Sequence, residues 1–85
     1  MKIHIYSAKR LAKGVFDVQL AVYAGETAAV GNVVVRRRIN GTFGFACAYT
    51  DKWCSPSIFQ IVEAELGQAL TEIEDTVSTY LLEES

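Results

Sequence analysis

Residues 55–84 read SPSIFQIVEAELGQALTEIEDTVSTYLLEE, and this stretch decides the fold because it is the one long segment with helical periodicity. Ser55 suits a helix N-cap, and Pro56 is tolerated at the first helical position. The apolar residues recur every three or four positions and form one stripe, which leaves Ile61 and Leu82 on the polar side. The stripe comprises Phe59, Val62, Leu66, Ala69, Leu70, Ile73, Val77, Tyr80 and Leu81. The pattern predicts one amphipathic helix over 55–84, and Gly67 marks either close packing or a kink dividing that helix.

The chain before this helix alternates between apolar and polar residues as β-strands do. The predicted strands are Met1–Ser7, Val15–Tyr23, Thr27–Ile39 and Thr42–Thr50. Residues 8–14 are predicted to form a basic connection, residues 24–26 a turn, and Gly31-Asn32 a bulge or bend within the third strand. We therefore expect one α+β domain over 1–85: a four-stranded antiparallel meander (1–50), a connection (51–54) and one long C-terminal helix packed across one face.

The turn signal Asn40-Gly41 predicts a β-hairpin between the last two strands, in one of two registers. A two-residue loop pairs Arg36 with Phe45 and leaves an open face of arginine and aromatic side chains. That face would carry Arg36, Arg38, Phe43, Phe45 and Tyr49, extended by His4, Tyr6 and Tyr23. A three-residue loop pairs Arg37 with Phe45 and turns the aromatic side chains into the core. Because a one-residue slip moves every side chain to the other face, the sequence leaves both registers open.

Composition excludes several classes of protein. The 85 residues are 51% hydrophobic and include one proline, which favours a folded domain over disorder. The sequence contains neither a signal peptide nor a run of about 20 apolar residues, so we expect a cytoplasmic protein without a membrane partner. Cys47, Cys54 and His4 lack the short paired spacing of a zinc site, and we expect neither metal nor cofactor.

The sequence also argues against an enzyme. None of the phosphate-loop, dinucleotide, metalloprotease or nucleophile-elbow motifs is present. The only histidine, His4, lies on a predicted strand without an acidic neighbour. The helix glutamates flank the apolar stripe as those of a solvated helix do, so we expect no catalytic residue.

Charge is segregated along the chain. Residues 1–52 contain all eight basic residues and three acidic ones, a balance of +5, whereas residues 53–85 contain seven acidic residues and no basic one. Such segregation steers partners or orients self-association. Tyrosine, tryptophan and arginine dominate interface energetics. The candidate protein-binding residues are therefore Tyr6, Tyr23, Arg36, Arg38 and Trp53, together with the acidic Glu65, Glu72, Asp75 and Glu83.

These features predict a small non-enzymatic binding protein that acts through macromolecular surface contacts. We expect a homodimer with a protein partner, for example a basic nucleic-acid-binding protein, as in a phage or mobile-element inhibitor of host defence or nucleic-acid machinery. One alternative is a single-stranded nucleic-acid-binding protein that uses Arg36, Arg38, Phe43 and Phe45, although the net charge of −2 disfavours it. A second alternative is a structural homo-oligomer.

Overall fold

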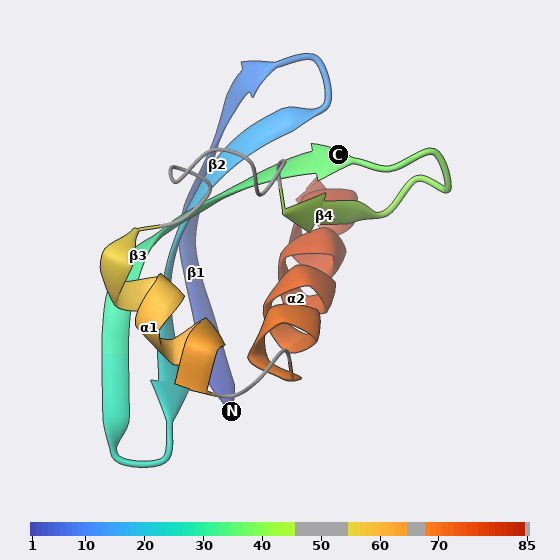
Figure 1. The fold of residues 1–85 in the computed structure, drawn as a ribbon. Coiled ribbons are helices and arrows are strands. Elements are labelled where there is room, and N and C mark those ends of the chain that lie inside the picture. Colours follow the sequence, from blue (N-terminus) through green and yellow to red (C-terminus); the bar gives the residue numbers. More distant parts are fainter. Residues whose placement is uncertain (46–54, 65–67, 85) are drawn as a thin grey trace.

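The computed structural model describes residues 1–45, 55–64 and 68–84, and it confirms the predicted α+β architecture (Figure 1). Four strands form one antiparallel sheet in sequence order: β1 (Lys2–Ala12), β2 (Val15–Ala24), β3 (Thr27–Arg37) and β4 (Phe43–Phe45). Two helical segments follow, α1 (Pro56–Ala64) and α2 (Gln68–Glu84).

β1 is longer than the sequence pattern predicted. It continues to Ala12, so most of the stretch expected to be a basic connection is a strand. The register between β1 and β2 shifts between Ile5 and Ser7 and again between Arg10 and Ala12. Each shift puts an extra residue into β1 and breaks the alternation that a sequence pattern relies on. Only residues 13 and 14 remain as the turn, where Gly14 has a φ of 72°.

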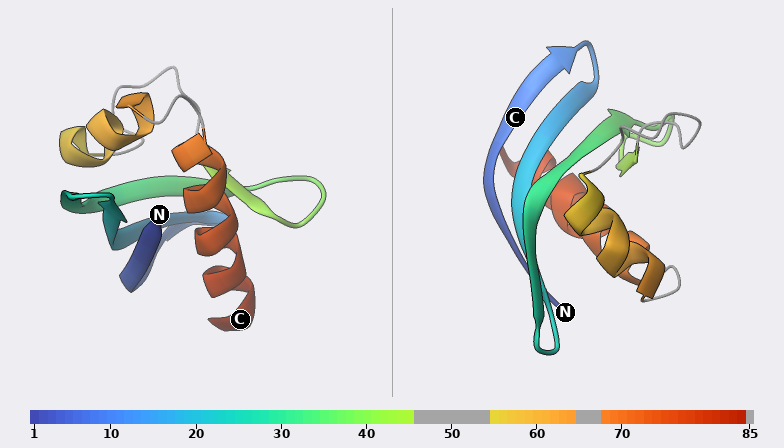
Figure 2. Two further views of the ribbon diagram at one scale, coloured as in Figure 1. Left: turned by 90° about the horizontal axis from the view of Figure 1, so that it is seen from below. Right: turned by 60° about the vertical axis from the view of Figure 1, so that its left-hand side comes forward.

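Both helices lie on the same side of the sheet (Figure 2). The core between the two layers is built from alternate residues of β2 and β3, from Phe43 of β4 and from one side of each helix. It comprises Val18, Leu20, Val22, Val33, Val35, Phe43, Ile58, Ile61, Ala69, Ile73, Val77 and Leu81. Burial of this apolar surface is the main force that holds the helical layer on the sheet.

The helical region differs from the single continuous helix that the stripe predicted. α1 ends at Ala64 and α2 begins at Gln68; Gly67, for which the sequence left either close packing or a kink open, lies outside the described residues. The stripe is correct for α2, where Ala69, Ile73, Val77 and Leu81 are buried. It is wrong for α1, where Ile58 and Ile61 are buried and Phe59 is 40% exposed. A stripe drawn through both segments assumes one helical phase, and α1 and α2 do not share it.

The β3–β4 hairpin adopts neither of the two predicted registers. Phe45 pairs with Val35, and Arg37 with Phe43. The backbone N–H of Arg38 donates to the Thr42 carbonyl at 2.6 Å, which leaves a three-residue loop that ends at Gly41 with a φ of 90°. A three-residue loop of this kind is a turn followed by a glycine in the left-handed region. The aromatic side chains therefore face the core, as the three-residue alternative required, although the pairing differs.

The predicted bulge at Gly31-Asn32 is also wrong, because β3 pairs with β2 without a shift. Gly31 serves a packing purpose instead. A Cβ on Gly31 would overlap the Ser55 side chain and come within 2.9 Å of Ile58. The backbone N–H of Ser55 donates to the Asn32 carbonyl at 2.9 Å, and the Ser55 hydroxyl accepts the Asn32 N–H at 3.2 Å. The start of α1 is thereby held against β3.

Candidate functional site

The sheet face opposite the helices is the first candidate surface, because no described element covers it (Figure 2). The strand registers arrange this open face in rows. At the end near the β2–β3 turn, Tyr23 lies beside Ala28, and Ala21 beside Val30. Tyr23 is 42% exposed and Val30 is 67% exposed. We call Tyr23, Ala28 and Val30 the apolar patch of the open face.

The other end of the open face is polar. Lys9 pairs with Asp17, and Asp17 accepts a hydrogen bond from the Asn32 side-chain amide at 2.9 Å. Arg36 lies opposite Val15 and is exposed. Near the β2–β3 turn the open face is thus apolar on β2 and β3 but borders Lys2 of β1, which pairs with Tyr23, and toward its other end it is polar.

Of the predicted surface residues, Tyr6, Tyr23 and Arg36 are all exposed. Tyr23 and Arg36 lie on the open face, near opposite ends of the β2–β3 pair. Tyr6 is the extra residue at the first shift in β1 and contacts His4, with the ring centroids 4.6 Å apart in an edge-on arrangement. Trp53 and Glu65 lie outside the described residues.

Arg38 has a structural role that the sequence did not reveal. Its guanidinium forms an ion pair with Glu74 of α2 at 3.0 Å and donates to the Phe43 carbonyl at 3.3 Å. The side chain crosses Gly44, where any Cβ would meet the guanidinium. Arg38 therefore links the hairpin to α2 and is less available to a partner than Arg36.

Phe43 and Phe45 do not form the stacking platform that the nucleic-acid alternative required. Phe43 is 3% exposed and packs edge-on against Phe16, with the ring centroids 5.6 Å apart. Phe45 is half-buried and packs against the core. The guanidinium of Arg37 lies 5.4 Å from the Phe43 ring centroid, on the core side of the sheet.

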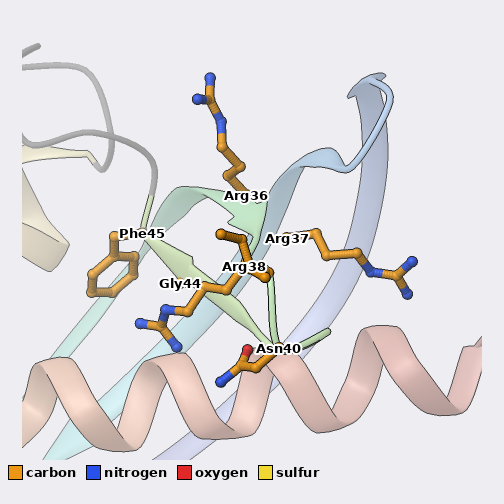
Figure 3. A pocket seen from close by; sticks show the side chains of 7 residues that line it. Arg36, Arg37, Arg38, Asn40, Gly44 and Phe45 are labelled. Atoms are coloured by element: carbon orange, nitrogen blue, oxygen red, sulfur yellow. The ribbon is translucent and has the colours of Figure 1, made fainter.

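A hollow of about 630 Å³ lies where β3 and β4 meet (Figure 3). It is lined by Arg36, Arg37, Arg38, Ile39, Asn40, Gly44 and Phe45. In Figure 3 the three arginine side chains extend in different directions, so their guanidinium groups do not converge on one point. This arrangement does not resemble a pocket built around a single small anion, which convergent donors would hold.

The solvent side of α2 is the second candidate surface. Glu72, Asp75 and Glu83 lie within one stripe of the helix, because they are separated by three and eight residues. Neither α1 nor α2 contains a lysine or arginine. Glu72 is 3.9 Å from the N-terminal amine of Met1, while Asp75 and Glu83 are exposed. We call Glu72, Asp75 and Glu83 the acidic strip.

Another acidic residue of α2, Glu74, faces β4 instead of solvent. Its carboxylate accepts the backbone N–H of Phe45 at 2.8 Å. One turn further along α2, the hydroxyl of Ser78 accepts the backbone N–H of Phe43 at 3.1 Å. These two side chains cover the outer edge of β4. The sequence pattern counted Glu74 with the solvated glutamates, and only the pairing of β4 with α2 distinguishes it.

Within residues 1–45, 55–64 and 68–84, no three His, Cys, Asp or Glu side chains are placed to hold a metal ion. Over the same residues, neither helix combines the length and hydropathy that a membrane crossing requires. No protein-family model, curated protein or solved structure matches the chain. The class of protein is therefore defined by the fold alone: a two-layer α+β protein with an open sheet face and an acidic helical face.

Proposed function

We propose that this protein is a non-catalytic binding protein that acts by occupying a surface on another protein. The observation that supports the proposal is the separation of charge between the two layers. The helical layer has an acidic outer side without lysine or arginine, and the sheet layer holds the basic residues of residues 1–45. A surface of one sign attracts partners of the opposite sign and rejects partners of the same sign.

The acidic strip is the surface we assign to the partner. The core side of α2 packs on the sheet, and Glu74 and Ser78 satisfy the edge of β4. Asp75 and Glu83 are exposed and take part in neither the packing on the sheet nor these hydrogen bonds to β4. Carboxylates spaced along one side of a helix present a row of negative charge, as a nucleic-acid backbone does. A basic nucleic-acid-binding protein is therefore the partner that fits, and an inhibitor of host defence or nucleic-acid machinery from a phage or mobile element would act in this way, in the cytoplasm.

The apolar patch on the open face is the surface we assign to self-association. A two-fold dimer is the commonest assembly of soluble proteins, and it brings the same patch of each copy together. Contact of Tyr23 and Val30 with their counterparts removes exposed apolar surface from water. A dimer formed through the open faces leaves both helical layers outside, so each copy presents its acidic strip to solvent.

The test is capture of the partner by the immobilised protein at low and high salt, with matched charge variants. Asp75→Asn/Glu83→Gln removes two charges from the acidic strip. The control Glu26→Gln/Glu63→Gln removes two exposed charges elsewhere, from the β2–β3 turn and from α1. We expect the captured protein to be lost with the strip variant and at high salt, and to be retained by the control. A partner retained equally at both salt concentrations, or lost equally with both variants, contradicts the proposal.

A further inference from the structure

The loop between β3 and β4 contains the only Asn-Gly pair of the chain, Asn40-Gly41. Asparagine is one of the thermolabile residues, because the backbone nitrogen of the next residue can attack its side-chain amide. Glycine in the next position leaves that nitrogen unobstructed, since it has no Cβ. Asn40 is exposed, so water and hydroxide reach its amide. The loop therefore combines a reactive pair of residues with access to solvent.

Two donors of one residue converge on the side-chain oxygen of Asn40. The backbone N–H of Thr42 donates to Oδ1 at 3.1 Å, and the Thr42 hydroxyl donates to the same atom at 2.7 Å. A backbone N–H can only donate, so the atom that faces it is the oxygen and not the nitrogen of the amide. Negative charge develops on this oxygen when the carbon beside it, Cγ, is attacked. The two donors are thus arranged as those that stabilise an oxyanion.

The guanidinium of Arg38 fixes the direction in which the Thr42 hydroxyl donates. Nη1 of Arg38 lies 3.4 Å from Oγ1 of Thr42. A guanidinium can only donate, so the hydroxyl oxygen accepts from Arg38 and the hydroxyl proton points to Asn40. Arg38 is itself held by the ion pair with Glu74 and by the Phe43 carbonyl. A chain of donors, from Arg38 through Thr42, therefore polarises the side-chain carbonyl of Asn40.

We propose that Asn40 is a site of spontaneous deamidation in the folded protein, and that Thr42 stabilises the carbonyl that reacts. Hydroxide removes the proton of the Gly41 N–H, and the nitrogen attacks Cγ of Asn40 within the same loop. The side-chain nitrogen takes a proton from water and leaves as ammonia, and a cyclic succinimide remains. Water then opens the ring. Cleavage of the bond to Cγ gives aspartate, and cleavage of the bond to the backbone carbonyl carbon gives isoaspartate.

One contact of the loop opposes this reaction. The Gly41 N–H donates to the Arg38 carbonyl at 3.0 Å, and this hydrogen bond has to open before the nitrogen can turn toward Cγ of Asn40. The net stabilisation from such a bond is small, because water replaces the lost partner. Arg38 and Asn40 are exposed, so water is at hand for this exchange. The opening is confined to the loop and leaves the pairing of β3 with β4 in place.

Deamidation changes the charge where β3 and β4 meet. Aspartate at position 40 adds one negative charge to the hollow that Arg36, Arg37 and Arg38 line, and its carboxylate still accepts both donors of Thr42. Isoaspartate lengthens the main chain of the three-residue loop by one atom, which disturbs the backbone hydrogen bond between Arg38 and Thr42. Neither product alters the acidic strip or the apolar patch. This inference therefore goes beyond the proposed function and does not depend on it.

The experiment incubates the full chain at neutral pH and measures the deamidated fraction by peptide mass mapping. We expect Asn40 to convert and Asn32 to stay intact. Asn32 lies within β3 before the buried Val33, and its side-chain amide donates to Asp17 at 2.9 Å. Thr42→Val removes the hydroxyl and is expected to slow conversion of Asn40 about twofold to tenfold, the value of one hydrogen bond. Thr42→Ser keeps the hydroxyl and is expected to convert at the wild-type rate.

The same rates measured in guanidinium chloride separate the effect of the fold from that of the local sequence. In the unfolded chain we expect Thr42→Val to convert as fast as the wild-type protein, because nothing holds the hydroxyl against Asn40. The inference is overturned if Asn40 stays intact in the folded protein, or if Asn32 converts equally. It is also overturned if the folded Thr42→Val variant is not slowed, if Thr42→Ser is slowed as much, or if the slowing persists in denaturant. Thermal melting checks that each variant is folded. The Asp75→Asn/Glu83→Gln variant is expected to deamidate as the wild-type protein does, so the two proposals fail separately.

Discussion

A single hydroxyl of α2 supports the last strand of the sheet. The backbone N–H of Phe43 points away from β3 and donates to the Ser78 hydroxyl at 3.1 Å. Ser78 is 7% exposed and Phe43 is 3% exposed, so water cannot easily replace the hydroxyl. A buried N–H without an acceptor costs free energy comparable to a lost hydrogen bond.

Ser78→Ala is therefore expected to lower the free energy of unfolding by about 1–3 kcal/mol, the penalty of an unsatisfied buried donor. Chemical denaturation measures it. Thr79→Ala, one residue along α2 and exposed, is the control, because it also gains the helix propensity of alanine without losing the acceptor. Equal stability of the two variants would show that Phe43 does not depend on Ser78.

Two strand glycines differ in what surrounds them. An added Cβ on Gly31 would meet the Ser55 side chain and Ile58, which belong to the buried contact between α1 and β3. An added Cβ on Gly44 would meet the guanidinium of Arg38, the end of a flexible side chain. The same substitution therefore displaces packed structure at Gly31 and only a movable group at Gly44.

Gly31→Ala is expected to destabilise the protein by about 1–3 kcal/mol, as overpacking of a core does. Gly44→Ala is expected to cost less than Gly31→Ala, because the Arg38 side chain is 47% exposed and its guanidinium can move away from the added Cβ. Thermal or chemical unfolding of both variants measures the difference. A Gly44→Ala variant as unstable as Gly31→Ala would contradict the packing described at the start of α1.

At the scale of the element, the apolar stripe in the sequence predicts the buried side of one helix but not of the other. The stripe of α2 could be predicted, because Ala69, Ile73, Val77 and Leu81 recur with one helical phase and pack on one sheet. The buried side of α1 could not be predicted in this way. A single stripe continues the phase of α2 into α1, whereas the buried Ile58 and Ile61 give α1 a helical phase of its own.

Ile58→Ala is expected to destabilise the protein by about 2–5 kcal/mol, because Ile58 is 0% exposed and a cavity would remain. Phe59→Ala, at the position the sequence pattern placed in the core, is expected to cost clearly less, since Phe59 is 40% exposed. Denaturant midpoints of the two variants decide between the phases. A larger loss of stability for Phe59→Ala than for Ile58→Ala would show that Phe59 belongs to the core, as a single continuous stripe predicts.

The register of the β3–β4 hairpin and the way the sheet edges are covered could not be predicted from the sequence, because they involve residues far apart in the chain. The dipeptide Asn40-Gly41 indicates a turn but not the number of loop residues. The hydrogen bond from the Phe45 N–H to Glu74 of α2, which accompanies the pairing of Val35 with Phe45, joins residues that are far apart in the sequence. The β4 edge is covered by Glu74 and Ser78. β1, which pairs only with β2 among the described strands, carries register shifts and lysines, features that discourage edge-to-edge pairing. We therefore place self-association on the open face and not on β1.

At the scale of the whole molecule, the sequence predicted the segregation of charge but not its geometry. The balance of +5 before residue 53 and the acidic remainder are visible in the composition. The strand registers alone show that Lys9, Arg10, Lys13, Arg36 and Arg37 gather at one end of the sheet. The apolar patch was not predicted, because the face on which Val30 lies follows from the β2–β3 register, which puts Val30 beside Ala21 on the open face.

The solution mass of the protein, measured by light scattering, is the most direct test of self-association through the open face. We predict twice the 9.4 kDa mass of the chain. Val30→Lys, in the apolar patch, is expected to give the mass of one chain. Leu82→Lys, at an apolar side chain of α2 that is 43% exposed, is expected to keep the dimer. A wild-type protein with the mass of a single chain, or a Val30→Lys variant that remains a dimer, would contradict self-association through the open face.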